Sequence, residues 1–274
     1  VATKETEWFN NIVLDSGLAR MSVGTWIDRC CVGTGNTISA ISQTALASFL
    51  ASTTTIQSTS AELQTTTLPY YRSLKVTWRF SEGVAAGNIS EVGMGWGNTT
   101  LWNRALVLDA NGNPTTITVL GDEFLDVVAE IRVYPTLSNE GSFALLDKLG
   151  ATISTHTFTG SPYMVTPGEA FLKISSNNLN VYSGTKNDSV IAVPASSLGS
   201  TTTRVDSYPT PTSIKSVFTL GLTTTNGIHQ SYRVQMSGLL GQSYYKFQIT
   251  PTITKTSAQI MTYTATMSWG RYEG

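Results

Sequence analysis

Apolar and polar side chains alternate with a period of two residues along several segments, and this alternation restricts the fold more than any other feature of the sequence. The clearest case is the segment 74–80, in which every second residue is apolar. Its apolar residues are Leu74, Val76, Trp78 and Phe80, and its polar residues are Lys75, Thr77 and Arg79. Because successive side chains of a β-strand point to opposite faces, the pattern predicts a strand with one buried face.

The same alternation returns near the end of the chain. Between residues 261 and 269 threonine or serine occupies every second position, and the residues between them are larger and less polar. These residues are Met261, Tyr263, Ala265, Met267 and Trp269. Apolar character, together with bordering turn residues, predicts further strands. We place them at 101–108, 125–134, 214–222 and 244–250.

Composition agrees with a chain built from strands. Threonine and serine make up about a quarter of the 274 residues, and only 13% are charged. Threonine favours strands, whereas the charged residues that usually cover surface helices are scarce. We therefore predict an all-β fold, a β-sandwich or jelly-roll-like arrangement of antiparallel sheets with at most one or two short helices. One helix is expected at 42–50, where four apolar residues form a patch.

We interpret residues 1–274 as a single elongated β unit. The alternative is two packed sub-domains, 1–140 and 141–274, because the segment 138–142 is rich in residues that favour turns. Residues 108–114 contain Asn-Gly and predict a hairpin loop. The threonine-rich stretch 52–67 fits either extended sheet or a mobile connection.

Charge and hydropathy exclude several classes of partner. The formal net charge is −1 and no basic run is present, so we expect no nucleic-acid partner. No apolar run reaches the roughly 18 residues that cross a bilayer, so no membrane insertion is expected. Cys30 and Cys31 are adjacent and are predicted to be small apolar side chains of a strand, not a disulfide.

Residue patterns for catalysis or metal binding are weak. His156 and His229 lack partners at metal-ligand spacing, and we expect them at the surface or packed in a turn. Asp126 and Glu130 share a strand face at about 13 Å, beyond the roughly 6.5 to 9.5 Å of an inverting glycosidase. We expect no catalytic, cofactor-binding or metal-binding residues, no cofactor and no enzymatic activity.

Two further features carry alternative interpretations. The glycine-rich segment 93–97 opens no predicted helix, which favours close backbone approach over a nucleotide site. Several aromatic side chains would bind a host-surface glycan if they were exposed, although such residues more often lie in a core or an interface. They are Tyr70, Tyr71, Trp96, Trp102, Tyr244, Tyr245 and Trp269.

Segments in the first half of the chain, taken in order, resemble tailed-bacteriophage virion proteins. The resemblance begins with FNNIVLDSGL at 9–18 and continues with CVGTGNT at 31–37 and QTAL at 43–46, where Gln43 replaces an aspartate of the pattern. It ends with a strand pair within 89–117 and with EFLDVVAEIRV at 123–133. The resemblance covers about residues 8–134 and does not extend to 135–274.

The resemblance implies a structural protein of the virion, made in the host cytoplasm, in the tail, neck or collar, or fibre-attachment region. Such a protein would assemble as a symmetric homo-oligomer, and its partners would be copies of itself and other virion proteins. The segments 52–67 and 83–100 are expected to contact those neighbours. A capsid decoration or head-fibre protein and a glycan-binding adhesin module are the alternatives.

Overall fold

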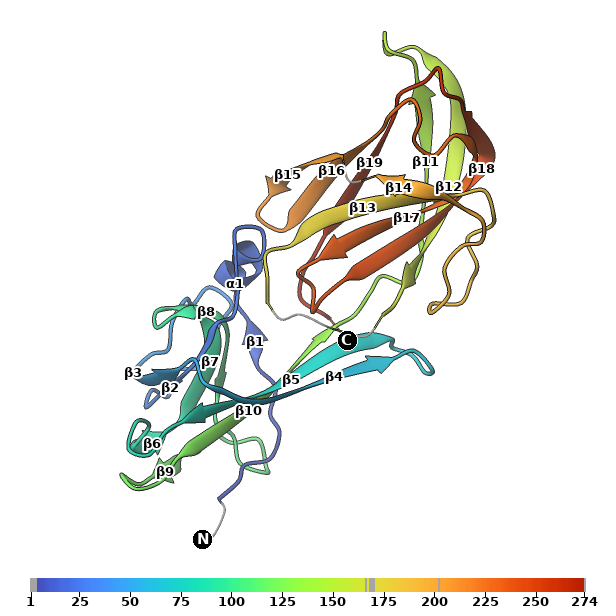
Figure 1. The fold of residues 1–274 in the computed structure, drawn as a ribbon. Coiled ribbons are helices and arrows are strands. Elements are labelled where there is room, and N and C mark those ends of the chain that lie inside the picture. Colours follow the sequence, from blue (N-terminus) through green and yellow to red (C-terminus); the bar gives the residue numbers. More distant parts are fainter. Residues whose placement is uncertain (1–3, 166, 168–170, 202, 274) are drawn as a thin grey trace.

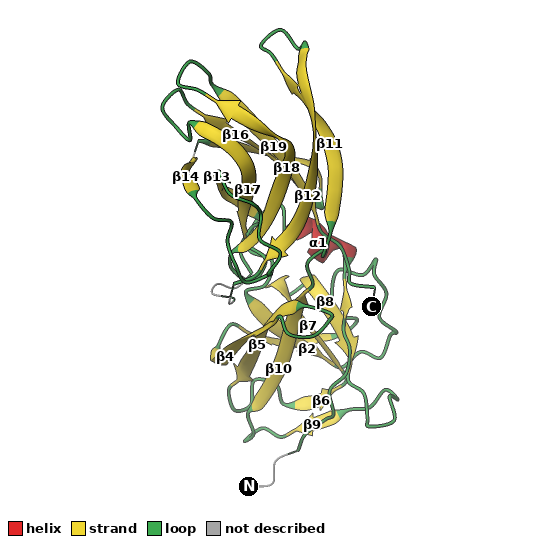
Figure 2. Ribbon diagram, turned by 90° about the vertical axis from the view of Figure 1, so that its right-hand side faces the viewer, coloured by secondary structure: helices red, strands yellow, loops and turns green. Residues whose placement is uncertain are grey.

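The structure, a computed structural model, describes residues 4–165, 167, 171–201 and 203–273. It is 53% strand and 2% helix, and its five sheets are antiparallel, so the all-β prediction is confirmed. Figure 1 shows an elongated molecule with two lobes, and Figure 2 shows that both lobes consist of strands joined by loops, apart from one short helix. The sheets of one lobe use residues 12–133 and those of the other use residues 139–268.

The first lobe contains a five-stranded sheet, a three-stranded sheet and a strand pair. The five-stranded sheet has the order β1 (Ile12–Val13), β8 (Thr100–Leu106), β7 (Glu91–Gly97), β2 (Arg29–Gly33) and β3 (Phe49–Thr53). The three-stranded sheet has the order β10 (Leu125–Val133), β5 (Tyr71–Phe80) and β4 (Ile56–Gln64), and β6 (Gly87–Ile89) pairs with β9 (Ile117–Val119). The helix α1 (Asp15–Arg20) follows β1 and lies against β8.

The second lobe is a sandwich of two sheets. Its six-stranded sheet has the order β11 (Asn139–Leu146), β12 (Thr152–Tyr163), β18 (Ser243–Lys255), β17 (Gly227–Ser237), β13 (Ser175–Tyr182) and β14 (Ser197–Thr201). The three-stranded sheet has the order β15 (Arg204–Thr210), β16 (Ser213–Leu220) and β19 (Met261–Ser268). Buried residues of both sheets, such as Leu179, Ile214 and Phe218, form the core between them.

The period-two pattern identifies the buried faces correctly. In β5, Val76, Trp78 and Phe80 are at most 1% exposed, whereas Lys75 on the opposite face is exposed. In β19 the first two apolar residues are buried, and the threonines that alternate with the apolar residues are exposed. The other predicted strands correspond to β8, β10, β16 and part of β18. Both cysteines lie in β2 with no exposed surface and without a disulfide, as the sequence predicts.

The predicted helix at 42–50 is wrong. This segment is a loop that leads into β3, and the helix α1 lies earlier in the chain. Residues far along the chain form the hydrogen bonds of this loop's backbone. Thr44 O accepts a hydrogen bond from Leu101 N, and the Glu91 carboxylate accepts hydrogen bonds from Ala47 N and Ser48 N. These long-range bonds compete with the local bonds that a helix needs.

Two predicted connections have different outcomes. Residues 108–114 do form a turn, with Gly112 at φ 80° and Asp109 accepting bonds from Asn111 N and Asn113 N. The strand after that turn, β9, pairs with β6, and only an isolated bridge between Leu108 and Pro114 closes the expected hairpin. Most of the threonine-rich stretch 52–67 is sheet, in the end of β3 and in β4.

Direct contacts join the two lobes. Trp26, which has no exposed surface, packs against Trp102 and Phe171, and its indole N–H donates to Leu172 O at 2.9 Å. Arg72 of β5 donates to Gln242 O at 2.6 Å. One hydrophobic cluster includes buried residues of both lobes, so the core is continuous between them. The interpretation as a single β unit, with the packed sub-domains 1–140 and 141–274 as the alternative, stays a prediction.

Candidate docking site

A loop of the first lobe, residues 34–48, is built around a buried ion pair. Glu91 of β7 and Arg104 of β8 have no exposed side-chain surface, and the Arg104 guanidinium donates to the carboxylate at 2.7 Å. Two charges removed from water are stable only when each is paired and fully hydrogen-bonded. The surroundings of this pair supply those further bonds.

The Glu91 carboxylate binds both ends of the loop. It accepts hydrogen bonds from Gly35 N at 3.0 Å, Ala47 N at 3.0 Å and Ser48 N at 2.7 Å. Burial alone would raise the pKa of Glu91, but the bonds from Ser48, Ala47 and Arg104 outweigh it and lower that pKa. The carboxylate therefore stays ionised, and its charge fixes the shape of the loop.

Arg104 holds the middle of the same loop. Its guanidinium donates to Gln43 Oε1 at 2.6 Å and to Thr37 O at 2.8 Å, in addition to Glu91. Leu46 packs into a small buried cluster with Leu14 and other residues beneath the loop. The loop is thus attached through charge, hydrogen bonds and apolar contact, although it contains no regular secondary structure.

The attachment depends on a glycine in the segment VGTGNT. A Cβ atom at Gly35 would lie 2.4 Å from Glu91 Oε1 and 2.7 Å from Ala47 Cβ. Real Cβ atoms do not approach so closely, so any larger residue would displace the carboxylate from the loop. Close packing accounts for this glycine.

The outer side of the loop presents apolar residues to solvent. Ile38 is 81% exposed and Ile41 is 43% exposed. Beside them lies an open groove of about 330 Å³. Residues 10–12, 38–39, 104–106 and Leu108 line it. Three segments on which the phage resemblance rests, 9–18, 31–37 and 43–46, therefore meet around this loop and groove.

Two loops of the second lobe are also fixed by a buried cation and expose apolar side chains. Lys246, which has no exposed surface, donates to Ser189 O and to Ala192 O, the latter at 2.9 Å, and that loop exposes Ile191 and Val193. Burial, with a smaller effect of Lys186, lowers the pKa of Lys246 to about 8.

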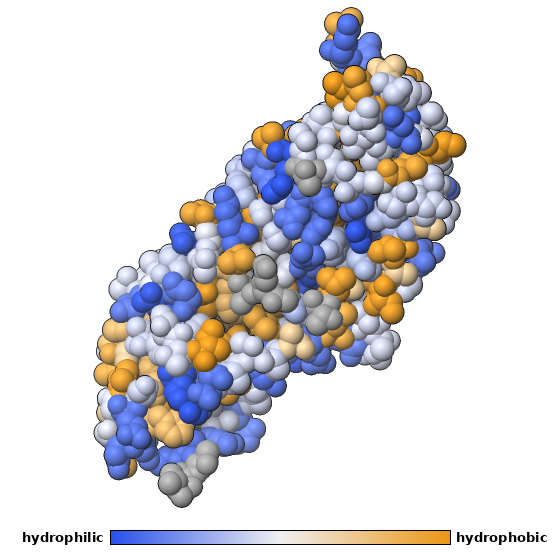
Figure 3. Space-filling model, viewed as in Figure 1, coloured by the Kyte–Doolittle hydropathy of each residue, from blue (hydrophilic) through white to orange (hydrophobic). Residues whose placement is uncertain are grey.

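Lys255 is the buried cation of the other loop. Its ammonium donates to Asn226 Oδ1 at 2.7 Å, and Leu222 of the same loop is 49% exposed. In each of these three places a buried cation fixes a loop whose apolar side chains face solvent. Other apolar residues are scattered among polar ones on the face that Figure 3 shows.

The two histidines are buried, so neither lies at the surface, and His229 takes the other expected position, packed against a turn. His156 bonds to Ser154 Oγ and Pro251 O, both at 2.7 Å. His229 bonds to Tyr263 Oη at 2.8 Å and to Thr225 O at 2.7 Å, and burial lowers its pKa. Both rings are fully used in joining strands or loops.

The carboxylates considered for catalysis are each paired with an arginine. Asp126 accepts two hydrogen bonds from Arg79, and Glu130 accepts two from Arg132. Among the residues that the structure describes, no group of three or more His, Cys, Asp or Glu side chains could hold a metal ion. These bonds stabilise the outer face of the sheet.

The glycine-rich segment is an interior strand, and the expectation that 83–100 forms a contact loop is wrong for most of its length. In β7, which pairs with β2 and β8, Gly93, Met94 and Gly95 are buried. A Cβ atom at Gly95 would lie 2.2 Å from Thr100 O. Close backbone approach, as predicted, explains this glycine.

The aromatic residues considered for glycan binding are all buried or partly buried. Trp102 is 7% exposed and Tyr244 is 9% exposed. Trp269 donates its indole N–H to Leu18 O, and Tyr245 accepts a bond from Thr136 N. These side chains therefore serve the core and the contacts between segments, as the more frequent role of such residues suggests.

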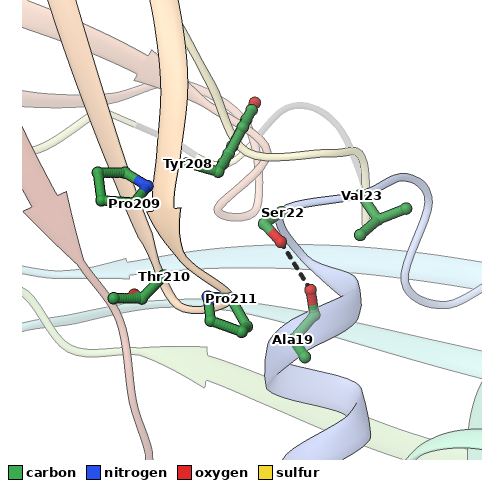
Figure 4. Close-up of a pocket in the computed structure, with 7 residues that line it drawn as sticks. All are labelled: Ala19, Ser22, Val23, Tyr208, Pro209, Thr210 and Pro211. Atoms are coloured by element: carbon green, nitrogen blue, oxygen red, sulfur yellow. Dashed lines mark hydrogen bonds between the residues drawn. The ribbon is translucent and has the colours of Figure 1, made fainter.

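A second open pocket, of about 450 Å³, lies between α1 and the turn that joins β15 to β16 (Figure 4). Its lining comprises Ala19, Ser22, Val23 and residues 208–211. The titratable side chain in this lining is Tyr208, whose hydroxyl donates to Ile174 O at 2.7 Å. The lining thus places no base and no pair of carboxylates beside its serine and threonine hydroxyls.

Comparison with protein-family models, with curated proteins and with solved structures finds no match to this chain. Among the described residues, none of the helical structure is long and apolar enough to cross a membrane. The interpretation of function therefore rests on the residues themselves and on their arrangement.

Proposed function

We propose that this protein is a non-enzymatic structural component of a tailed-phage particle and assembles as a symmetric homo-oligomer in the tail, neck or fibre-attachment region. The observation that carries the proposal is the loop 34–48. It contains TGNT of the segment VGTGNT and the whole of QTAL, and it exposes Ile38 and Ile41 on a support fixed by buried charges. Exposed apolar residues on a rigid support are typical of protein interaction sites.

The proposed mechanism is docking of a preformed body. The continuous core holds the two lobes together, and the ion pair of Glu91 and Arg104 fixes the loop before any partner binds. A preformed loop loses little conformational entropy on association, which favours tight subunit contacts. Its partners would be other copies of this chain and other virion proteins.

Quantitative mass spectrometry of washed particles of the phage that encodes this chain tests the proposal. We expect the chain in those particles at a copy number that fits a symmetric ring or fibre, and absence from them would refute the proposal. A copy number matching the many positions of the capsid would instead indicate a decoration protein.

A variant pair tests the role of the loop in the same particles. Ile38→Asp places a charge on the proposed contact and should reduce incorporation at least tenfold, since about 1.4 kcal/mol already changes binding tenfold. Ile153→Asp, at a residue of β12 that is 63% exposed, is the control. Equal incorporation of both variants would exclude the loop as the docking site.

A further inference from the structure

The strand β4 is an uncovered edge of the first lobe. It pairs with β5, and no other strand of the described residues lies on its far side. Residues 56–62 are all exposed, including Thr59 and Ala61, whose register partners on β5, Val76 and Leu74, belong to the core side of the sheet. Figure 1 shows β4 at the margin of the lobe. Backbone groups along this edge are therefore free to pair with another strand.

Two other edge strands carry groups that oppose such pairing. The opposite edge of the same sheet, β10, contains Asp126, Glu130 and Arg132. The edge strand β15 contains two charged residues and a proline. Charged side chains and proline on an edge strand are common means of preventing association between sheets.

The strand β4 has little such protection. Its sequence is IQSTSAELQ, in which the one charged residue, Glu62, accepts a hydrogen bond from the Tyr71 hydroxyl at 3.5 Å. The edge strand β19 also lacks charge, but two of its residues are buried within its own sandwich and every second residue is at least partly covered. Among these edges, β4 combines an absence of basic residues and proline with exposure on both faces.

We propose that β4 pairs antiparallel with β4 of a second copy of this chain, across a twofold axis at Ser60. The inference rests on the self-assembly in the proposed function and identifies the strand that mediates it. In this register Thr59 lies opposite Ala61 of the second copy, and Glu62 lies opposite Ser58 of the second copy. No like charges face each other, and opposed side chains point to the same face, so the two three-stranded sheets become one continuous sheet.

The composition of β4 favours a second copy over a different partner. A strand that selects a charged partner presents the opposite charge, and a strand that binds an apolar groove presents large apolar side chains. Residues 57–61 are small or neutral, as self-pairing requires. Such pairing places the same surface of both copies in contact, which closes into an assembly with an even number of chains.

Sedimentation velocity of the purified full chain tests the pairing. We expect a mass of twice 29.5 kDa, or an even multiple of 29.5 kDa. Ser60→Lys opposes two ammonium groups at the axis and should at least halve that mass. The control Thr264→Lys, at an exposed residue of β19, should leave it unchanged. A wild-type monomer, an odd-numbered assembly, or an assembly that survives Ser60→Lys would overturn the proposal.

Cysteine cross-linking tests the register. The native Cys30 and Cys31 have no exposed surface, so an introduced cysteine is the accessible thiol. Ser60→Cys should form a disulfide-linked dimer under mild oxidation, and Thr223→Cys, in an exposed loop, should not. A mixture of Ser58→Cys and Glu62→Cys should cross-link more than either variant alone. Failure of Ser60→Cys to dimerise would refute the register.

The outcome is separable from that of the proposed function. Wild-type chain that is monomeric in solution yet present in washed particles would overturn the β4 pairing and leave the virion role intact. Chain that pairs through β4 in solution but is absent from washed particles would overturn the virion role and leave the β4 pairing intact.

Discussion

Replacing Glu91 with glutamine should destabilise the first lobe strongly. The substitution preserves size but removes the charge that balances Arg104, whose side chain has no exposed surface. It also weakens the bonds from Gly35 N, Ala47 N and Ser48 N, since a neutral amide oxygen is a poorer acceptor than a carboxylate. The loop 34–48 would lose the group that joins its two ends.

The magnitude follows from the burial of the pair. Removing one partner of a buried ion pair costs about 3 to 5 kcal/mol, because the other charge remains buried without compensation. For chains of this size each kcal/mol lowers Tm by about 2 to 4 °C, so we expect a fall of roughly 6 to 20 °C. Glu130→Gln, which removes half of a more exposed pair with Arg132, should cost less than about 1 kcal/mol.

Urea denaturation followed by tryptophan fluorescence measures both variants, and its pH dependence adds a second readout. The pKa of Glu91 is lowered in the folded protein from its ordinary 4.5, so its contribution is present above that value. The contribution is lost as the pH falls through the lowered folded pKa, and Glu91→Gln should remove that part of the acid dependence. A cost equal to that of Glu130→Gln, with unchanged acid dependence, would refute the role given to the pair.

Four further substitutions or reactions test other parts of the structure. Trp26→Ala should lower the free energy of unfolding by about 3 to 5 kcal/mol and raise the radius of gyration in small-angle scattering, since Trp26 joins the lobes and has no exposed surface. Gly95→Ala should cost roughly 1 to 3 kcal/mol in urea denaturation because its Cβ meets Thr100 O, whereas Gly121→Ala, with open space around its Cβ, should be neutral. The pKa of Lys246 is lowered from 10.5 to about 8 in the folded protein, so the unfolded chain binds more protons than the folded one between pH 8 and 10.5. The free energy of unfolding should therefore rise with pH in this range, and Lys246→Met should flatten that rise in urea denaturation. The Cys30 and Cys31 thiols, whose pKa values burial raises, should react with a disulfide reagent only after denaturation, and rapid reaction of the native protein would contradict their burial.

The fold class and several strands could be predicted from local sequence because they depend on local periodicity. Val76, Trp78 and Phe80 alternate with polar residues, and one face of β5 is buried in consequence. The threonines between Met261 and Trp269 mark the wetter face of β19 for the same reason. When one face of a sheet is buried, every second residue of its strands is apolar, and the sequence shows this as a pattern of period two.

The loop 34–48 could not be predicted in this way. Ala45, Leu46 and Phe49 resemble the apolar stripe of a helix, but the backbone of their segment bonds to Leu101 and to Glu91, which lie more than 40 residues later in the chain. The helix propensity of residues 42–50 does not depend on these distant hydrogen-bond partners, so it cannot predict them. Glu91 and Arg104, each the one charged residue of its strand, were the available signal of a buried pair.

The burial of the histidines could not be predicted for a related reason. His229 lies near the turn Asn226-Gly227 and packs against it through Thr225 O, but its burial also needs Tyr263 from the distant strand β19. The sequence around a single histidine does not reveal which strand will pack over it. The pairing of β9 with β6 likewise depends on long-range topology that the turn at 108–114 does not encode.

The position of the chain in an electron-microscopy map of the phage particle tests the central claim most directly. We predict density for the two-lobed body at a symmetric site of the tail, neck or fibre-attachment region, with Ile38 and Ile41 buried against a neighbouring subunit. Such density would also show whether β4 pairs with β4 of a second copy. A complete particle map without this body, or with the loop 34–48 facing solvent in every copy, would contradict the claim.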